Sequence, residues 1–149
     1  MNDCIFCQII AGKSPASLCY EDDLVIGLMD IAPVNSGHMM VIPKRHATYL
    51  ADLDESTGRR MWTVAQRTAA ALRESGVRCE GVNLFLADGE AAFQEVFHVH
   101  LHVFPRFPGD PFKLAIDLDA PPERAELDDV AKRIGAAYAR LWGKEGMGE

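Results

Sequence analysis

The sequence predicts an α+β fold, in which an antiparallel sheet is accompanied by one long helix and a C-terminal helix. Two groups of β-rich stretches flank a segment whose apolar residues recur at helical spacing, and a second helical segment closes the chain. This order differs from the regular alternation of strands and helices that would indicate a parallel sheet. No internal repeat, low-complexity run or flexible linker divides the 149 residues, so we expect a single domain.

The first β-rich stretches are residues 24–29 and 39–42, which consist almost wholly of Val, Ile, Leu and Met. Residues 30–37 between them are rich in Pro, Asn, Ser and Gly, which favour turns and loops. We therefore predict a hairpin or meander in this part of the chain.

The long helix is predicted to begin after Asp52, because Glu55 follows three positions later as in a capping box, and to end at Gly76. Its apolar residues have the spacing of an amphipathic helix. The residues on this face are Met61, Val64, Ala65, Thr68 and Leu72. Two strands, 81–86 and 96–104, are expected next, and Pro105 is expected to end the second one.

The C-terminal helix is predicted within an extension over residues 117–149. It follows Pro121 and Pro122 and is expected to end near Gly143. Its apolar positions again have helical spacing. They are Leu127, Val130, Ala131, Ile134, Tyr138 and Leu141.

Charge and composition exclude several classes of protein. The net charge of −7 makes extended nucleic acid an unfavourable partner, although a local pocket can still hold a small phosphate. No segment is long and apolar enough to predict a membrane span, and the N-terminus has no signal-like stretch, so we expect a cytoplasmic protein. In that compartment the Cys4-x-x-Cys7 pair favours metal or redox chemistry over disulfides, whereas Cys19 and Cys79 are expected to be ordinary small apolar residues.

Three of the five histidines, His98, His100 and His102, alternate along the last predicted strand. Alternation places them on one face of the sheet and the intervening Val99 and Leu101 on the other. A polar strand edge would more often use Thr, Lys or Glu. Two chemical interpretations remain: a three-histidine metal site, and a histidine nucleophile assisted by its neighbours. Successive residues of one strand converge poorly on a single ion, which is a difficulty for the first.

The run His98-Val99-His100-Leu101-His102-Val103 resembles the signature of the histidine triad (HIT) superfamily of nucleotide hydrolases and transferases. The resemblance extends over residues 4–106 and is greatest to the bacterial HINT-like nucleotide-binding proteins with an N-terminal CxxC zinc site. The other matching segments are Cys4-Ile5-Phe6-Cys7, Gly37-His38-Met39-Met40-Val41-Ile42-Pro43-Lys44 with His46, Gly89-Glu90-Ala91-Ala92-Phe93-Gln94, and Pro105-Arg106. The resemblance implies the HIT fold, with about five antiparallel strands and one long central helix.

The resemblance also implies a catalytic site made of His38, His98, His100 and His102. In the family the middle histidine of the triad attacks the α-phosphorus of a nucleotide, which makes His100 the expected nucleophile and a nucleotidyl-histidine the expected intermediate. His102 is then expected to donate a hydrogen bond to phosphate oxygens, and His38 to support it. The implied substrate is a small purine nucleotide, such as an adenosine phosphoramidate or a dinucleoside polyphosphate.

The nucleotide-binding residues implied by the resemblance come from several segments. Asp30 corresponds to the acceptor of the ribose hydroxyls, and Gln94 lies where the family places polar groups near the phosphates. The apolar wall around the base would consist of Ile5, Phe6, Ile9 and Leu28. The sequence departs from eukaryotic family members at Ala87 and Glu95, where they carry an amide and a hydroxyl.

Zinc and a second subunit are further implications of the resemblance. Bacterial members complete the CxxC pair with two histidines, here His46 and His98, and two thiolates with two imidazoles are typical of a structural zinc site. A metal-bound His98 would not relay protons. The family also forms homodimers through the long helix and a sheet edge, and Met61 and Trp62 are compatible with such an interface.

Three alternatives stay open at this level: a non-catalytic nucleotide-binding module, a nucleotidyltransferase and a three-histidine metallohydrolase. The first would show no covalent intermediate. The second would need an additional acceptor site, and the third would lose activity to chelators.

Overall fold

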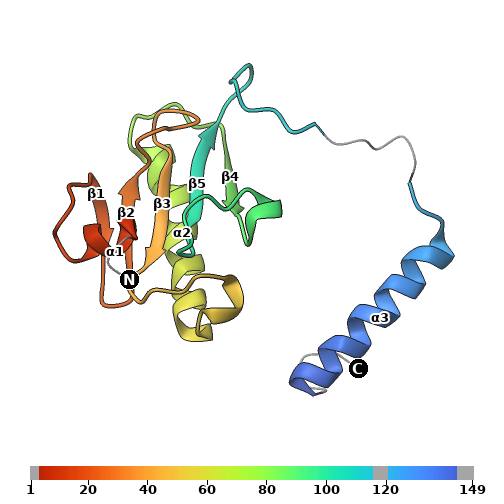
Figure 1. Ribbon diagram of the computed structural model, residues 1–149. Coiled ribbons are helices and arrows are strands. Elements are labelled where there is room, and N and C mark those ends of the chain that lie inside the picture. Colours follow the sequence, from red (N-terminus) through yellow and green to blue (C-terminus); the bar gives the residue numbers. More distant parts are fainter. Residues whose placement is uncertain (1–3, 116–120, 144–149) are drawn as a thin grey trace. The chain divides into compact units, whose positions relative to one another are not determined.

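The computed structural model describes residues 4–115 and 121–143 of the chain (Figure 1). The chain divides into two compact units, residues 1–112 and 113–149, which are considered separately. The first unit contains a five-stranded antiparallel sheet in the order β1-β2-β3-β5-β4, which confirms the predicted α+β class. The strands are β1 (Leu18–Glu21), β2 (Val25–Met29), β3 (Met39–Pro43), β4 (Gly81–Leu86) and β5 (Leu101–Arg106). The helical segments of this unit are α1 (Ile5–Ile10), α2 (Glu55–Glu74) and two short 3-10 helices, η1 (Leu50–Asp52) and η2 (Glu90–Ala92).

Two apolar clusters lie on opposite faces of the sheet because side chains alternate along β2 and β3. On one face, residues such as Val25 and Val41 pack with the apolar residues of α2. On the other, Ile26, Leu28 and Ile42 pack with Phe6 of α1. Among the described residues of the first unit, α1 is the α-helix that packs on the second face, and the candidate site lies on this face.

Helix α2 begins two residues later than predicted. Its N-cap is Asp54, whose side chain accepts a hydrogen bond from the backbone N–H of Thr57. Asp52 instead ends η1 and accepts from the N–H of Tyr49, so the capping signal read from the sequence belongs to a separate turn. The predicted apolar face is confirmed as the buried one. Met61 is only 2% exposed, however, and is therefore not available for a subunit interface, whereas the neighbouring Trp62 is 62% exposed.

Strand β5 differs most from the sequence expectation. It spans Leu101–Arg106 instead of 96–104 and therefore continues through Pro105. The Pro105 carbonyl points away from β4 and accepts a hydrogen bond from the side-chain amide of Asn35. In a strand the N–H and the carbonyl of one residue point to the same side, so the N–H that Pro105 lacks would also point away from β4. Its absence removes no hydrogen bond between β5 and β4, and proline is therefore tolerated at this position. Helix α1 and strand β1 were not predicted from the sequence as separate elements.

The second unit contains helix α3 (Arg124–Trp142), which confirms the predicted C-terminal helix. It ends at Gly143, which has a positive φ of 72°. None of the residues of α3 is buried within the described part of the chain, and its apolar side chains are exposed along one face. Within residues 4–115 and 121–143, no helix has the length and apolar character needed to cross a membrane.

Candidate active site and metal cluster

The three triad histidines point to the same side of the sheet, although only His102 lies within β5. His98 ends a bend over residues 96–98, in which its backbone N–H donates to the carbonyl of Val96, and His100 lies in the short segment between this bend and the strand. Val99 and Leu101 pack into the core beneath α2. The predicted alternation of histidine and apolar side chains therefore begins before Leu101, the first residue of β5. The His100 and His102 rings lie 4.9 Å apart between centroids.

The hydrogen-bond partner of His100 determines which of its two ring nitrogens carries the proton. Its Nδ1 lies 2.7 Å from the backbone carbonyl of His98, which can only accept, so Nδ1 donates a proton there. The neutral ring then has an unprotonated Nε2. The ring of Phe6 packs against His100 at a centroid distance of 5.2 Å, and His100 lines a cavity of about 550 Å³. A buried, oriented imidazole with a free lone pair is the arrangement that a nucleophile requires.

His38 and His102 form a chain of hydrogen bonds whose direction is also determined. The backbone N–H of Val34 donates to His38 Nδ1 at 3.1 Å, so neutral His38 has its proton on Nε2. That Nε2 lies 2.8 Å from His102 Nδ1 and can donate to it, which leaves the proton of His102 on its own Nε2. Burial, together with the nearby His100 and His38 rings, lowers the pKa of His102 to about 4, and burial also lowers the pKa of His38. Both rings are therefore neutral at pH 7.

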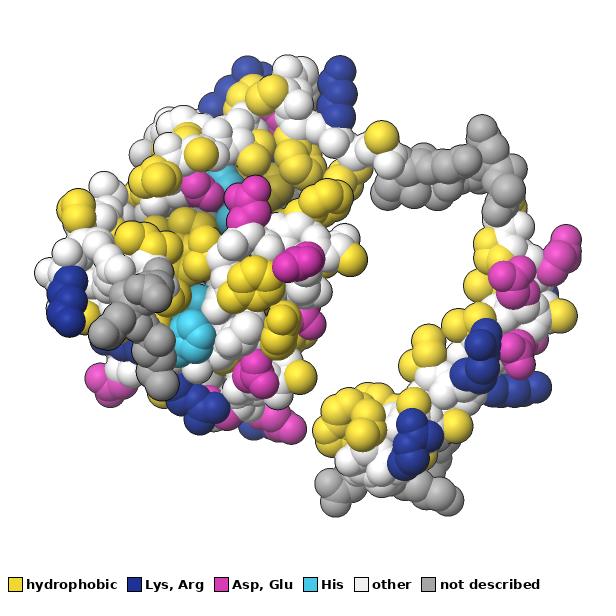
Figure 2. Space-filling model, in the orientation of Figure 1, with side chains coloured by type: hydrophobic (Ala, Val, Ile, Leu, Met, Phe, Trp, Pro, Cys, Tyr) yellow, Lys and Arg dark blue, Asp and Glu magenta, His cyan; other side chains and the backbone are white. Residues whose placement is uncertain are grey.

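The cavity brings together most of the residues that the sequence assigned to nucleotide binding. Ile5, Phe6, Ile9, Leu28 and Asp30 all line it. Sequence reasoning did not include several further lining residues, namely Pro15, Ala16, Ser17, Met29, Ile31, Ala32, Met40, Phe93, Glu95 and Val96. Figure 2 shows one histidine surface (cyan) recessed between apolar (yellow) and acidic (magenta) side chains. Among the described residues, no Lys or Arg lines this cavity.

Gln94 is the exception among the predicted binding residues, because it is not part of the cavity lining. Its side chain is 4% exposed and points into the protein. Its amide oxygen accepts from the N–H of Gly89, and its amide nitrogen donates to the carbonyls of Thr48 and Val96. The side chain therefore fixes the loop before the triad, and the expectation of a phosphate contact is corrected.

Cys4, Cys7, His46 and His98 form a cluster whose ligand atoms all lie within 4.8 Å of one another. The S–N distances are 3.4 Å from Cys4 to His98, 3.4 Å from Cys7 to His46 and 3.7 Å from Cys7 to His98. Tetrahedral zinc with ordinary bond lengths places sulfur and nitrogen ligands about 3.5 Å apart. His98 Nε2 lies 2.8 Å from the Pro43 carbonyl and donates to it, so its Nδ1 has a free lone pair facing the two sulfurs. The donor set and its protonation therefore fit zinc.

A second group, Asp30, His38 and His102, has similar spacing but does not fit a metal. The Asp30 carboxylate lies 3.5 Å from His38 Nε2 and 3.6 Å from His102 Nδ1. Binding a cation would require an unprotonated His38 Nε2, and that nitrogen must keep its proton because Nδ1 already accepts from Val34. This cluster is therefore a hydrogen-bonding network.

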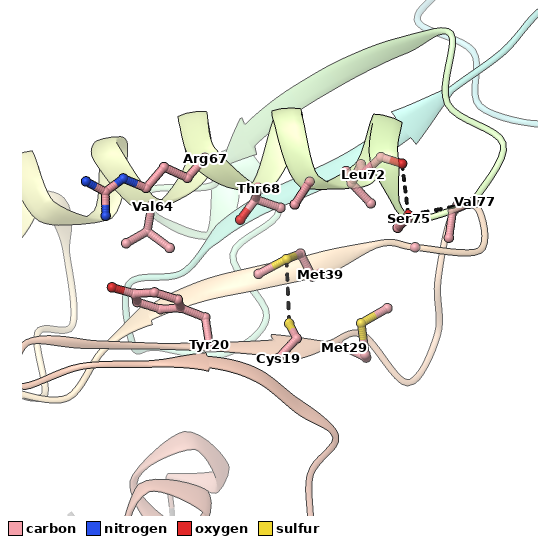
Figure 3. A pocket seen from close by; sticks show the side chains of 12 residues that line it. Cys19, Tyr20, Met29, Met39, Val64, Arg67, Thr68, Leu72, Ser75 and Val77 are labelled. Carbon is pink, nitrogen blue, oxygen red and sulfur yellow. Dashed lines mark hydrogen bonds between the residues drawn. The ribbon is translucent and has the colours of Figure 1, made fainter.

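A separate cavity of about 310 Å³ lies on the opposite face of the sheet, between α2 and the strands β1–β3 (Figure 3). Its lining is mostly apolar, including Met39, Val64 and Leu72, with Arg67 at one end. The Cys19 thiol in this cavity contacts the Met39 sulfur at 3.7 Å, and burial raises its pKa. Its described lining contains no histidine or carboxylate to act as a general base near pH 7, so the histidine-lined cavity is the better candidate for an active site.

Comparison with known proteins identifies the family of this chain. The HIT domain family matches residues 11–109, which include the triad. The chain belongs to the HIT family. An uncharacterized HIT-like protein of Borreliella burgdorferi is 43% identical over 113 residues, covering 75% of this chain and 81% of that protein. The Adenylylsulfatase HINT3 of Arabidopsis thaliana is 38% identical over 106 residues, which are 70% of this chain and 53% of that protein.

Solved HIT structures support the fold, and one of them is described as Zn-bound. The crystal structure of SMU.412c from Streptococcus mutans aligns with a TM-score of 0.86 and 33% identity, and covers 93% of this chain and 87% of that one. A Zn-bound histidine triad family protein from Mycobacterium smegmatis aligns with a TM-score of 0.71 and 41% identity, with coverage of 91% and 98%.

Proposed function

We propose that this HIT protein is a nucleotide hydrolase that cleaves at the α-phosphorus of a small purine nucleotide through a covalent intermediate on His100. The observation that carries the proposal is the orientation of His100. Its Nδ1 proton is held by the His98 carbonyl, and its Nε2 lone pair is available in a cavity that contains an apolar wall and the Asp30 carboxylate. An apolar wall suits a flat base, and a carboxylate can accept from two ribose hydroxyls. The relative named an adenylylsulfatase supports an adenylyl-containing substrate.

In the first step His100 Nε2 forms a bond to the α-phosphorus, and the bond from phosphorus to the leaving group breaks. The leaving group departs with the electron pair of that bond. In the second step water attacks the phosphorus, the bond to Nε2 breaks, and nucleoside monophosphate is released while a proton passes to solvent. His102 Nε2–H can donate to a non-bridging oxygen in both steps, and the His38 hydrogen bond holds it in the donor tautomer.

The electrostatics of the cavity limit the substrates that fit. The described lining has no cationic side chain and two carboxylates, Asp30 and Glu95. A neutral His102 donor contributes a dipole and no full charge, so a substrate with a single negative charge on its phosphorus is favoured over a polyphosphate. Of the two expected classes, adenosine phosphoramidates therefore fit the cavity better than dinucleoside polyphosphates.

A rapid-quench experiment tests the covalent step. Wild-type protein mixed briefly with adenosine 5′-phosphoramidate should gain the mass of one adenylyl group, and peptide mapping should place it on His100. His100→Asn should gain no mass and lose turnover by several orders of magnitude, yet still bind AMP. An adenylyl group on another residue, or wild-type turnover by His100→Asn, would refute the proposal. A wild-type protein that binds AMP but forms no adduct and no product would instead be a non-catalytic binding module.

We further propose that Cys4, Cys7, His46 and His98 hold a structural zinc ion. When bound, zinc would supply a crosslink between α1, the segment after β3 and the segment before β5. Protein expressed without added metal should contain about one zinc per chain by elemental analysis. Cys7→Ser should lose the metal and melt at a lower temperature, whereas the control Cys19→Ser should retain it. Full stability of metal-free wild-type protein would reject the site.

A homodimer is the proposed assembly. Exposed apolar side chains lie on α2 and on the edge strand β4, at Trp62, Leu84 and Phe85, with exposed fractions of 62%, 36% and 40%. Light scattering after size exclusion should give twice the mass of the chain, and Trp62→Glu should shift it toward the monomer. A wild-type monomer at micromolar concentration would contradict this proposal.

A further inference from the structure

A buried polar cluster joins the segment after β5 to the segment before β3. The Asp110 side chain at its centre is only 2% exposed. Its carboxylate accepts hydrogen bonds from the guanidinium of Arg106, from the side-chain amide of Asn35 at 3.0 Å, and from the backbone N–H groups of Phe107 and Phe112. All of these partners are donors, so a carboxylate with two acceptor oxygens suits this position.

Asn35 links this cluster to the turn that contains His38. The Asn35 amide nitrogen donates to the Asp110 carboxylate and, at 2.9 Å, to the Pro105 carbonyl, so both of its protons are used. The backbone carbonyl of Asn35 accepts from the N–H of His38 at 3.0 Å. Asn35 is 7% exposed and does not line the histidine cavity. Its influence on the chemistry must therefore pass through the turn that it holds.

The same turn presents the backbone N–H of Val34 to His38 Nδ1, at a distance of 3.1 Å. Val34 immediately precedes Asn35, so the anchored Asn35 side chain also fixes the direction of this N–H. A donor facing Nδ1 places the His38 proton on Nε2, which then donates to His102 Nδ1. His102 keeps its own proton on Nε2, the nitrogen that is proposed above to donate to a phosphoryl oxygen.

The nearby Asp30 carboxylate does not determine this arrangement of protons. It lies 3.5 Å from His38 Nε2 and 3.6 Å from His102 Nδ1, so it stabilises a proton between these two nitrogens almost equally on either ring. In the alternative arrangement His102 Nδ1 donates to His38 Nε2, and His102 Nε2 carries a lone pair that would repel a phosphoryl oxygen. His38 Nδ1 would then carry a proton that faces the Val34 N–H. The Val34 N–H is therefore the group that favours one arrangement over the other.

We propose that Asn35, held by Asp110, is a positioning residue that keeps the proton of His38 on Nε2 and thereby keeps His102 in its donor tautomer. The site neither gains nor loses a proton, because the two neutral rings hold two protons in either arrangement. Asn35 determines the nitrogens on which these protons lie. The catalytic consequence rests on the hydrolase function proposed above, whereas the effect on the tautomers does not depend on it.

The test measures the tautomers directly, through the NMR chemical shifts of the imidazole nitrogens of His38 and His102 in ligand-free protein. In wild-type protein each ring should be protonated on Nε2. In Asn35→Ala the turn loses its anchor and water can reach His38 Nδ1 as donor or acceptor, so both rings should populate the form protonated on Nδ1. The kcat for adenosine 5′-phosphoramidate should fall about tenfold to a hundredfold, with KM and AMP affinity little changed, because the affected hydrogen bond serves the transition state.

Asn83→Ala is the matched control. The Asn83 side chain on β4 accepts from the Arg106 guanidinium of the same cluster but makes no hydrogen bond to the turn. Its removal should leave the tautomers and kcat at their wild-type values. Asn35→Ser has a side chain too short to reach both the Asp110 carboxylate and the Pro105 carbonyl. It should resemble Asn35→Ala, and it decides the question if Asn35→Ala does not fold.

The outcomes separate the positioning role from the hydrolase function. A folded Asn35→Ala protein with both rings still protonated on Nε2 overturns the proposal. An equal change of tautomers in Asn83→Ala also overturns it, because the effect would then be a general loosening of the cluster. Changed tautomers with an unchanged kcat overturn the catalytic consequence. If wild-type protein forms neither adduct nor product, the hydrolase function fails, and the tautomers of Asn35→Ala still decide whether Asn35 positions His38.

Discussion

Gly37 immediately precedes His38, and its replacement by alanine should damage both stability and the active site. The φ of Gly37 is +98°, and a Cβ there would lie 2.8 Å from Val77 Cγ1, 3.1 Å from Leu72 Cδ2 and 3.3 Å from Pro105 Cγ. Positive φ costs an L-residue about 1–2 kcal/mol. Forcing a methyl group into this packed position costs about 1–3 kcal/mol more. We expect Gly37→Ala to lower the free energy of unfolding by about 2–5 kcal/mol, a large part of the 5–15 kcal/mol typical of a domain.

Gly12 provides a matched control for the steric contribution. Its φ is +68°, but a Cβ at this position would meet no heavy atom within 4 Å. Gly12→Ala should therefore cost only about 1–2 kcal/mol. The entropy that alanine removes from the unfolded chain is common to both variants and cancels in the comparison. Urea denaturation followed by circular dichroism gives both values. Equal losses for the two variants, or a loss below about 1 kcal/mol for Gly37→Ala, would refute the packing argument.

Two further predictions concern the hydrogen-bonding network of the site. Asp30→Asn should weaken AMP binding about tenfold in isothermal titration, because a carboxylate that accepts from two hydroxyls is replaced by a group with one acceptor oxygen; unchanged affinity would remove Asp30 from the ribose site. His102 has a folded pKa of about 4 against an ordinary value near 6.5, so between these values the unfolded chain binds a proton that the folded protein does not. Unfolding free energy should therefore be highest above pH 6.5, fall as the pH drops to about 4, and fall less steeply in His102→Gln when both are measured by urea titration; identical slopes would contradict the low pKa.

The sequence predicted the main elements because they depend on periodic patterns, whereas the expected site residues came from the resemblance to the HIT family. Alternation along β2 and β3 defines two faces, and helical spacing identifies α2 and α3. The predicted element boundaries were wrong where a local sequence signal has two interpretations. Glu55 follows Asp52 at capping-box spacing, yet the cap is Asp54. Pro105 is a strand terminator by propensity, yet it lies within β5, because the N–H it lacks faces away from β4.

Side-chain direction was less predictable than position along the chain. Gln94 lies next to the triad loop, and only the fold shows that its amide bonds to Thr48 and Gly89 instead of facing the cavity. Met61 and Trp62 are neighbours with similar hydrophobicity, and only their angular position on α2 makes one a core residue and the other an exposed one. Such differences depend on packing partners that are distant in sequence.

The sequence by itself determined that three histidines alternate along one segment and point to the same side and, through the motifs of the HIT family, which residues are expected to accompany them. The tertiary structure decided the protonation of each ring. His38 accepts from Val34, His98 donates to Pro43, and His100 donates to the carbonyl of His98. The physical reason is that the tautomer of an imidazole depends on whether its neighbour can donate or only accept, and most of those neighbours come from other segments of the chain. The same is true of Phe93, because a left-handed backbone at an aromatic residue is set by the surrounding turn and not by the residue itself.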